Sequence, residues 1–172
     1  LWGSCERISP EAPVQVVNVK SESVVLGGAG NVINNLEALG AQVDVISVIG
    51  GCEISDELKV LLTDIKVDTR YLITQKDRIT SKKSRIIASQ QQVVRYDRES
   101  TDAINRESQK EILDAFKSIV ADCDAVLLSD YGKGVLTKEL TVSLIDIANE
   151  NGKKVLVDPK GLDYSKYKGA FL

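Results

Sequence analysis

Residues 125–134 read AVLLSDYGKG, a short apolar run that stops at polar residues and glycines. The apolar part, Ala125 to Leu128, predicts a buried strand. A second stretch has the same arrangement, since Val155 to Val157 leads directly into Asp158-Pro159-Lys160-Gly161. Two strands that are separated by a helical pattern and end in polar loops favour a parallel α/β sheet.

Helical spacing surrounds these strands. Apolar residues recur at intervals of three and four from Ile112 to Val120, before the first strand, and from Leu140 to Ala148, before the second. Nearer the N-terminus, Val43 to Ile49 predicts another buried strand, and Leu58 to Ile65 repeats the helical spacing. The alternation of strand and helix therefore extends over most of the chain.

A different pattern indicates a small antiparallel sheet. Val14 to Val19 is a β-branched run, and three further extended segments follow it at Tyr71 to Thr74, Ser84 to Ser89 and Val93 to Asp97. The last two segments are joined across Gln90-Gln91-Gln92, which favours a hairpin.

Length and composition predict one domain. The chain has 172 residues, of which 43% are hydrophobic and 27% charged, as in globular domains. We expect an α/β core over about residues 26–66 and 106–172, with the antiparallel sheet over about 14–20 and 71–98. Methionine is absent even at position 1, and the last residues, Gly169 to Leu172, resemble the opening of a strand. We therefore expect a fragment, truncated at both ends.

Charge and residue usage exclude several classes of function. The 22 Lys and Arg against 25 Asp and Glu give a net charge of −3, which argues against a nucleic-acid partner. No uncharged apolar run approaches the ~18 residues of a membrane helix, and no signal peptide is evident. We expect a soluble, cytoplasmic protein with no membrane partner.

Histidine is absent, which excludes Ser-His-Asp and Cys-His catalysis and histidine-ligated zinc. The three cysteines, Cys5, Cys52 and Cys123, are too far apart for a metal-binding motif, and their odd number does not suggest a disulfide framework. We expect reduced, buried thiols and no metal site formed by the chain.

A glycine-rich turn, Gly27-Gly28-Ala29-Gly30-Asn31, precedes a helical pattern. It lacks the third glycine of the dinucleotide fingerprint, and the chain contains no G-x-x-x-x-G-K-[ST] phosphate loop. Gly28 and Asn31 could instead approach a polyhydroxylated ligand through backbone N–H groups and a side-chain amide. A turn with a purely structural role is an equal alternative.

Polar side chains follow the two strands described first. Asp130 and Lys133 follow one strand, and Asp158 and Lys160 follow the next. Because the carboxyl ends of parallel strands meet at one edge of a sheet, these groups should line a ligand site there. Lysine beside carboxylate suits a phosphate next to sugar hydroxyls. Solvated loop charges are the alternative.

Further basic residues lie outside this core. Arg85 and Arg95 fall on the antiparallel sheet, and Asp97 shares a face with Arg95 because strand side chains repeat every second residue. A surface ion pair is the simplest interpretation of these charges. Arg7 lies in an extended stretch that suggests no chemistry by itself.

Together these segments resemble the ribokinase-like carbohydrate kinases, also called the PfkB family. The resemblance covers essentially the whole chain, and it rests on the following stretches in this order: Arg7-Ile8-Ser9-Pro10-Glu11-Ala12-Pro13-Val14, Gly27 to Asn31, Gln91-Gln92-x-x-Arg95-x-Asp97, Ser129 to Gly134 and Asp158 to Gly161. Within the family, the joint match is most similar to the branch that phosphorylates a heptose 7-phosphate.

The resemblance implies a three-layer α/β/α sandwich with a small β-sheet lid, the use of ATP and Mg²⁺, and a homodimer formed through the lid. It places Gly28, Asn31 and Asp130 on sugar hydroxyls and Lys160, with Asp158, near the phosphates. Weaker candidates for the substrate's own phosphate are Arg7, Arg85, Arg95 and Lys133.

The implied reaction transfers the γ-phosphate of ATP to O1 of D-glycero-β-D-manno-heptose 7-phosphate, in the synthesis of ADP-heptose for lipopolysaccharide. In this branch an adenylyltransferase is often fused to the kinase. The family's G-A-G-D segment, with its proton-accepting aspartate, has no counterpart here, so no catalytic residue is assigned and that aspartate is expected beyond Leu172. The chain alone is then expected to be inactive. A kinase of another sugar, such as fructose 1-phosphate, and a noncatalytic sugar-phosphate-binding module are the alternatives.

Overall fold

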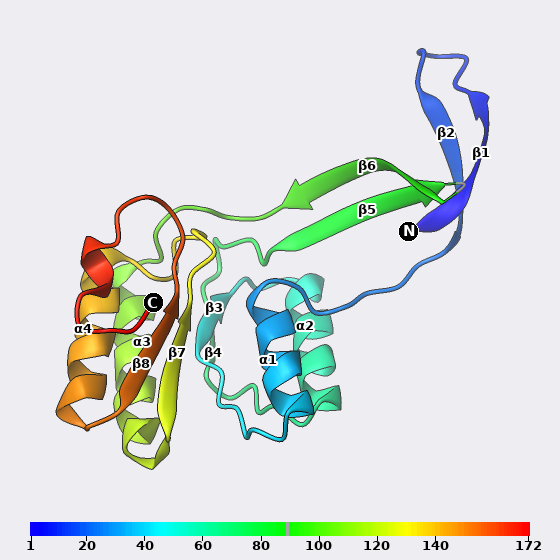
Figure 1. Ribbon diagram of the computed structural model, residues 1–172. Coiled ribbons are helices and arrows are strands. Elements are labelled where there is room, and N and C mark those ends of the chain that lie inside the picture. The colour runs from blue at the N-terminus through cyan, green and yellow to red at the C-terminus, as the bar shows by residue number, and fades with distance from the viewer. Residues whose placement is uncertain (89) are drawn as a thin grey trace. The chain divides into compact units, whose positions relative to one another are not determined.

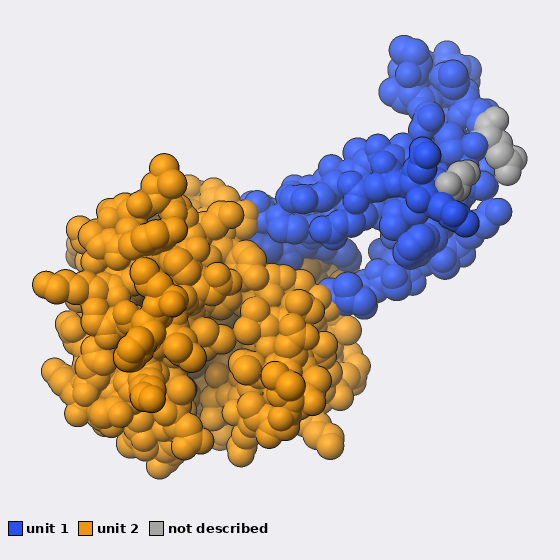
Figure 2. Space-filling model, in the orientation of Figure 1, with its two compact units in different colours: residues 1–25, 81–99 blue, residues 26–80, 100–172 orange. Residues whose placement is uncertain are grey.

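The computed structural model describes residues 1–88 and 90–172, and the chain divides into two compact units (Figure 2). Unit 1 contains residues 1–25 and 81–99, and unit 2 contains residues 26–80 and 100–172. In the described part of the chain, no helix is long and apolar enough to cross a membrane.

Unit 1 is a four-stranded sheet with the strand order β2-β1-β5-β6 (Figure 1). Strand β1 (Trp2–Ile8) pairs antiparallel with β2 (Gln15–Ser21), and β5 (Lys82–Ala88) pairs antiparallel with β6 (Gln91–Arg98). The two hairpins join where β1 runs parallel to β5. The pattern predicts the other three strands but not β1, whose residues have no clear alternation. Ser89, the expected end of β5, lies outside the described residues.

The register of unit 1 places most of its apolar side chains on one face and several charged side chains on the other. Residues paired across a ladder share a face, so Gly3 lies on one face with its partners Val19 and Ala88, and Ile86 lies there with Val94. This apolar face carries Val17, Val19, Ile86, Ala88, Val94 and Tyr96, and the paired Lys82 and Arg98 also lie on it. The opposite, charged face carries Lys83, Arg85, Arg95 and Asp97. Among the described residues of unit 1 there is no helix to cover either face.

Unit 2 alternates helices and strands. Its first half contains α1 (Ala29–Ala38), β3 (Ser47–Ile49), α2 (Glu53–Asp64) and β4 (Leu72–Thr74). Its second half contains α3 (Arg106–Ile119), the 3-10 turn η1 (Val120–Asp122), β7 (Ala125–Ser129), α4 (Lys138–Glu150), β8 (Lys154–Asp158) and the 3-10 turn η2 (Ser165–Tyr167). The strands form two parallel pairs, β3–β4 and β7–β8.

The extent of the antiparallel sheet differs from the expected range at its first strand. Leu72–Thr74, expected with the lid, pairs parallel with β3 in unit 2. Consecutive residues Leu72 and Ile73 are both buried, which requires a strand covered on both faces. The strand expected over Val43 to Ile49 is shorter, because Asp44 forms only an isolated bridge with Asp68.

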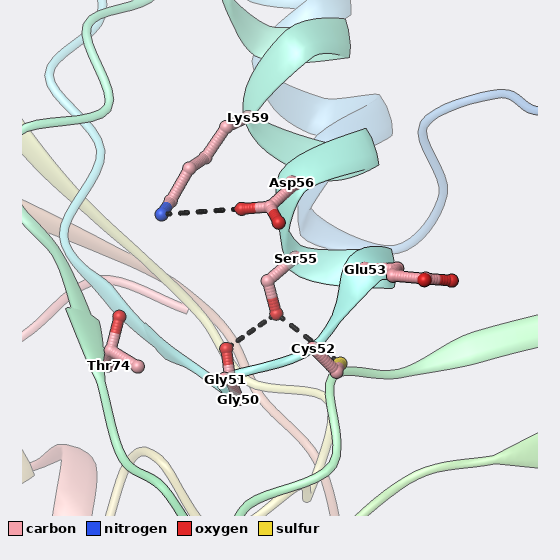
Figure 3. A pocket seen from close by; sticks show the side chains of 8 residues that line it. All are labelled: Gly50, Gly51, Cys52, Glu53, Ser55, Asp56, Lys59 and Thr74. Carbon is pink, nitrogen blue, oxygen red and sulfur yellow. Dashed lines mark hydrogen bonds and ion pairs between the residues drawn. The ribbon is translucent and has the colours of Figure 1, made fainter.

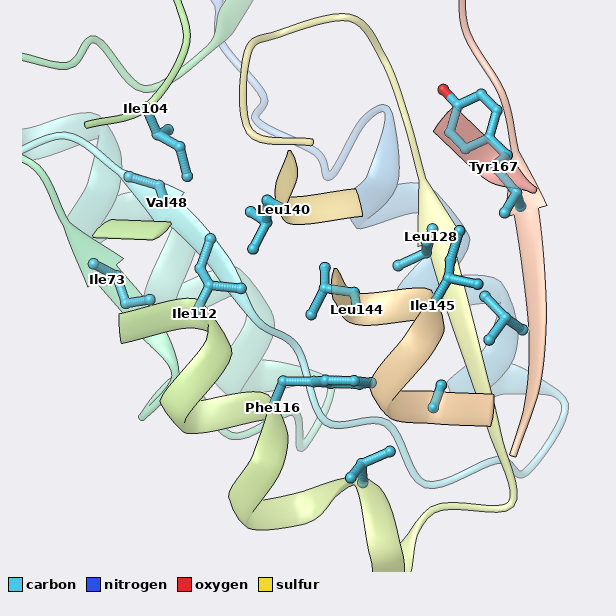
Figure 4. Packing of buried hydrophobic residues seen from close by; sticks show 14 residues of the cluster. Val48, Ile73, Ile104, Ile112, Phe116, Leu128, Leu140, Leu144, Ile145 and Tyr167 are labelled. Atoms are coloured by element: carbon cyan, nitrogen blue, oxygen red, sulfur yellow. The ribbon is translucent and has the colours of Figure 1, made fainter. Parts of the chain in front are cut away.

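Helices cover both faces of the β3–β4 pair. Ile49 and Leu72 pack on one side with residues of α2 and the following turn, among them Leu62 and Val67. Val48 and Ile73 pack on the other side, in the cluster that contains residues of α3 (Figure 4). This region has the layered α/β/α arrangement that the resemblance to the carbohydrate kinases implies.

The β7–β8 pair is covered by α3 and α4 on one face (Figures 1 and 4). Leu128, Val155 and Val157 pack there against apolar residues of the two helices, namely Ile112, Phe116, Leu140, Leu144, Ile145 and Ala148. On the opposite face, Leu127 and Leu156 are 41% and 48% exposed. Both helices have side-chain caps, since Asn105 accepts from Ser108 N–H and Thr137 from Leu140 N–H.

Candidate functional site

Two loops of unit 2 meet at the carboxyl ends of β7 and β8. The backbone N–H of Asp130 donates to the carbonyl oxygen of Asp158 at 2.9 Å. A Cβ added to Gly132 would lie 3.2 Å from Cγ of Lys160, so that side chain packs over the glycine. The prediction that the polar ends of these neighbouring strands lie at one edge is confirmed by this geometry.

The glycine turn at the start of α1 reaches the same edge. A Cβ added to Gly28 would lie 3.8 Å from the ring of Tyr131, in the loop after β7. Gly28 has φ +53°, which disfavours other residues there. Its carbonyl accepts the backbone N–H of Asn31 at 3.1 Å, and the Asn31 side chain is exposed in the first turn of α1. The turn thus presents backbone and an amide beside the β7 loop.

Asp130 is the buried centre of this site, with 7% of its surface exposed. Lys166 Nζ donates to its Oδ2 at 2.6 Å, and the Tyr167 hydroxyl donates to the same oxygen at 2.7 Å. Its Oδ1 accepts the backbone N–H of Gly132 at 2.7 Å. Asp130 is therefore tied both to its own loop and to η2.

Burial and hydrogen bonding act in opposite directions on Asp130. Burial has the largest influence and raises the pKa of the carboxyl, but donation from Lys166, Tyr167 and Gly132 together outweighs it, so the pKa lies below its ordinary value. Burial, and then the bond to Asp130, raises the pKa of Tyr167. Asp130 is thus an ionised carboxylate within the protein, and Tyr167 a neutral donor.

Lys166 and Tyr167 were not among the residues that the sequence singles out. Tyr167 is only 2% exposed and belongs to the hydrophobic core, whereas the Lys166 ammonium also donates to the carbonyl oxygen of Leu136 at 3.0 Å. They lie 36 and 37 residues after Asp130. The sequence offers one weak signal, a basic residue beside an aromatic one shortly after Gly161.

A buried arginine fixes the far end of the β7 loop. Arg78 is 7% exposed, and its guanidinium donates to the carbonyl oxygens of Asp102, at 3.1 Å, and Lys133. The carbonyl of Gly134 accepts the N–H of Ile104 at 3.0 Å. Arg78 is a third residue that the sequence does not single out, and it holds the loop that carries Asp130 and Lys133.

The other predicted site residues are more accessible. Asp158, the last residue of β8, and Lys160 are exposed, and Lys133 is partly buried. Arg7, Arg85 and Arg95 belong to unit 1, where Arg85 lies directly opposite Arg95 in the β5–β6 ladder. Asp97 accepts from Arg95 Nη2 at 2.7 Å and from Lys83 Nζ at 2.7 Å. The candidates are therefore divided between the two units.

A separate pocket of about 390 Å³ lies at the start of α2 (Figure 3). Gly50 N–H donates to Thr80 Oγ1 at 2.7 Å, and Ser55 Oγ, 2.8 Å from Thr80 Oγ1, donates to the Gly50 carbonyl at 2.6 Å. The single proton of Ser55 is used on that carbonyl, so Ser55 can only accept from the Cys52 thiol, 3.6 Å away. This network stabilises the glycine turn.

The described residues contain no group of three or more His, Cys, Asp or Glu side chains that could hold a metal ion. The three cysteines are free, but each is partly exposed, whereas the sequence predicts buried thiols.

Curated proteins resemble this chain along its whole length. It is 65% identical over 171 residues to the bifunctional protein HldE of Aliarcobacter butzleri, and 48% identical over 172 residues to HldE of Helicobacter pylori. The matches cover 99% and 100% of this chain but 36% and 37% of those proteins. The chain thus spans little more than a third of these relatives.

Solved structures share the fold at low sequence identity. A ribokinase of Arabidopsis thaliana, complexed with ribose and ATP, superimposes with a TM-score of 0.64 at 14% identity, covering 99% of this chain and 54% of the ribokinase. Phosphofructokinase-2 of Escherichia coli gives 0.61 at 20% identity, covering 96% and 53%. The expected ribokinase-like fold is confirmed by these likenesses. The model of the pfkB family of carbohydrate kinases matches residues 1–170, and the chain belongs to that family.

Proposed function

We propose that the protein containing this chain transfers the γ-phosphate of ATP to O1 of D-glycero-β-D-manno-heptose 7-phosphate, in the cytoplasm, as a step toward ADP-heptose. The observation that carries the proposal is the similarity to proteins named HldE over the full chain, at up to 65% identity. The chain supplies the sugar-binding part of the site.

The roles follow from position and chemistry. Asp130, in the loop after β7, accepts a sugar hydroxyl. The Gly28 backbone, beside Tyr131 of that loop, contacts others together with Asn31 of the same turn. The exposed ammonium of Lys160 offsets phosphate charge beside Asp158. The substrate's 7-phosphate is assigned to basic side chains, with Arg7, Arg85, Arg95 and Lys133 as the candidates.

The proposed phosphate donor is ATP, with Mg²⁺ as its accompanying ion. Mg²⁺ binds mainly through substrate phosphates, waters and one or two carboxylates. The ion would reduce the charge of the phosphates, and Asp158 is the exposed carboxylate next to Lys160.

The test is a phosphoryl-transfer assay on the protein that contains this chain, with ATP, Mg²⁺ and heptose 7-phosphate. Fructose 1-phosphate and ribose serve as competing acceptors, and the position of the new phosphate is read by ³¹P NMR. Transfer to O1 of the heptose supports the proposal. Preferential use of another sugar, or binding of the heptose without transfer, contradicts it.

Asn31 offers the cleanest test of the sugar assignment, because its side chain is exposed at the start of α1. Asn31→Ala should raise the KM for the sugar about tenfold, which corresponds to the loss of one hydrogen bond of about 1.4 kcal/mol. The KM for ATP should change little. Asn34→Ala, an exposed asparagine on the same helix, is the matched control.

We also propose a homodimer formed through unit 1. Its apolar face exposes Val19, Val94 and Tyr96, and no helix of the described residues in unit 1 covers them. A second copy of the same face would remove these side chains from water. Val16 alternates with Val17 along β2 and therefore points to the other face.

Val19→Asp should therefore convert a dimer to monomers, whereas Val16→Asp should leave the dimer intact. Both variants introduce the same charge into the same strand, so a general effect on folding would appear in both. Sedimentation velocity over a range of protein concentrations measures the outcome. Dimers that persist in Val19→Asp, or dissociation in both variants, would argue against this interface.

A further inference from the structure

The hydrogen bonds of Asp130 leave it a defined capacity for a ligand. A carboxylate has about four acceptor positions, two on each oxygen. Oδ2 uses both of its positions on Lys166 and Tyr167, and Oδ1 uses one on the N–H of Gly132. Counted over the described residues, a single position on Oδ1 remains. Asp130 can therefore accept one ligand hydroxyl.

The two donors to Oδ2 are themselves held in place. The Tyr167 ring is part of the hydrophobic core, so its hydroxyl has a fixed direction. Lys166 is held by two acceptors on different segments, Asp130 Oδ2 at 2.6 Å and the Leu136 carbonyl at 3.0 Å. These contacts prevent rotation of the carboxylate, because turning it would break bonds on both oxygens.

The charge on Asp130 matters for hydroxyl binding. An ionised carboxylate accepts a shorter and stronger hydrogen bond than a neutral acid, whereas a protonated Asp130 would place a donor in the site. Burial alone would favour the neutral acid. The two donors from η2 offset this effect, so they determine whether Asp130 can serve as an acceptor.

We propose that Lys166 and Tyr167 are positioning residues: they hold Asp130 ionised and fixed in rotation, so that one acceptor position on Oδ1 receives one hydroxyl of the sugar. That the ligand is a sugar rests on the proposed function. That Lys166 and Tyr167 keep the carboxylate ionised and fixed does not depend on it. Neither residue needs to contact the substrate. The segment that holds Asp130 in place is thus η2, which follows β8.

Other charged groups nearby contribute to the titration of this cluster. From the end of β8 come Asp158 and Lys160, the latter packed over Gly132. The loop before η2 brings Asp163, whose carboxyl interacts with Lys166 and with Lys138 at the start of α4. All of these groups remain unchanged in the variants chosen below.

Asp130→Asn is a poor test of this role. An amide has only one acceptor oxygen, so its N–H₂ would face either the donors from η2 or the N–H of Gly132. A loss of sugar binding could then not be distinguished from the effect of a disturbed fold. Tyr167→Phe removes one hydroxyl and keeps the ring in the core, and Lys166→Arg keeps the charge.

The first measurement is the titration of the Asp130 carboxyl in this chain by ¹³C NMR. Tyr167→Phe should raise the measured pKa of Asp130, Lys166→Met should raise it further, and Lys166→Arg should largely restore it. Tyr164→Phe and Lys168→Met, at exposed positions beside η2, are the matched controls. An unchanged titration in Tyr167→Phe and Lys166→Met would overturn the proposal.

The second measurement is steady-state kinetics of the protein that contains this chain, from acidic to neutral pH. Tyr167→Phe should raise the KM for the sugar about tenfold at acidic pH, with a smaller effect at neutral pH, while the KM for ATP stays unchanged. Equal losses for both substrates at every pH would indicate a structural role and overturn the proposal.

The two measurements separate this inference from the proposed function. If the titration shifts but the KM for the accepted sugar does not, Asp130 is not a sugar ligand and the positioning role is refuted. If the wild-type protein phosphorylates a sugar other than the heptose, the heptose assignment fails. The same variants, measured with that sugar, still decide the role of Lys166 and Tyr167.

Discussion

Two carboxylates in this chain accept similar hydrogen bonds in different environments. Asp97, in unit 1, is bound at 2.7 Å by Arg95 and by Lys83, whose side chains are 45% and 36% exposed. Asp130, in unit 2, is bound at 2.6 Å by Lys166, and its own side chain is 5% exposed. Water and salt screen the first network much more than the second. Burial, rather than contact distance, therefore determines what each network contributes to stability.

The pKa shifts of the two carboxyls do not indicate which network contributes more to stability. Hydrogen bonds from Arg95 and then Lys83 hold the pKa of Asp97 far below its ordinary value, because little burial opposes them. The pKa of Asp130 is also lowered, but against the opposing effect of burial. A strongly shifted carboxyl on the surface can thus contribute little to folding, while a buried and paired one can contribute more.

The largest effect is expected from Lys166→Met. This change leaves the Asp130 carboxylate buried without its cationic partner, which should cost about 3 kcal/mol of unfolding free energy. Lys83→Met in unit 1 is the matched comparison, and its cost should be much smaller. Urea denaturation of the two variants measures both. Equal losses would refute the contrast between the networks.

Tyr167→Phe should have the next largest effect. It removes a single hydrogen bond to a charged group and keeps the packing of the ring, at a cost of about 1.5 kcal/mol. Tyr164→Phe, at an exposed tyrosine, should leave the melting temperature unchanged. A larger loss in Tyr164→Phe than in Tyr167→Phe would mean that the Asp130 bond is not the cause.

Acid should then weaken the buried network. The pKa of Asp130 is lowered from 3.8, so its contribution is fully present above pH 3.8 and is lost as the pH falls through the folded-state value. The pKa values of Lys166 and Tyr167 are raised from 10.5 and 10.0, so their contribution is present below those values and is lost at more alkaline pH. Denaturation midpoints measured from acidic to alkaline pH show both losses of stability. An alkaline loss that is the same in Tyr167→Phe as in the wild type would contradict this account.

The smallest effect is expected from Asp97→Asn. The charged partners of this residue are accessible to water, so the midpoint of unfolding should hardly move. Any difference should vanish at about 1 M salt, where the screening length is about 3 Å. A loss comparable to that of Lys166→Met, or one that salt leaves unchanged, would show that the network in unit 1 is more than a surface feature.

Patterns within a short stretch of sequence predict the parts of the fold that are formed by that stretch alone. The run Ala125 to Leu128 and the polar loop after it predict both β7 and the place of Asp130, because a strand and its following loop are contiguous. The same reasoning identifies Lys160 after β8. Pairing to a distant partner is not encoded locally, so the assignment of Leu72–Thr74 to unit 2 could not be predicted.

The sequence does not reveal three residues at the site for the same reason, because their roles depend on contacts with distant segments. Lys166 and Tyr167 acquire their role from contact with Asp130, and Arg78 acquires its own from the carbonyls of Asp102 and Lys133. No motif marks such contacts, since any lysine or arginine in a loop has the same appearance in a sequence. Only the folded arrangement distinguishes a buried cation from a solvated one.

The closed network at Gly50 has a consequence for hydrogen exchange. The Gly50 amide is buried and donates to Thr80 Oγ1, so it can exchange only when this bond opens and water reaches the turn. Its protection factor should therefore report the opening of the segment between β3 and α2. Thr80→Val, which removes the acceptor and keeps the shape, should accelerate exchange at Gly50 while leaving amides of α4 protected.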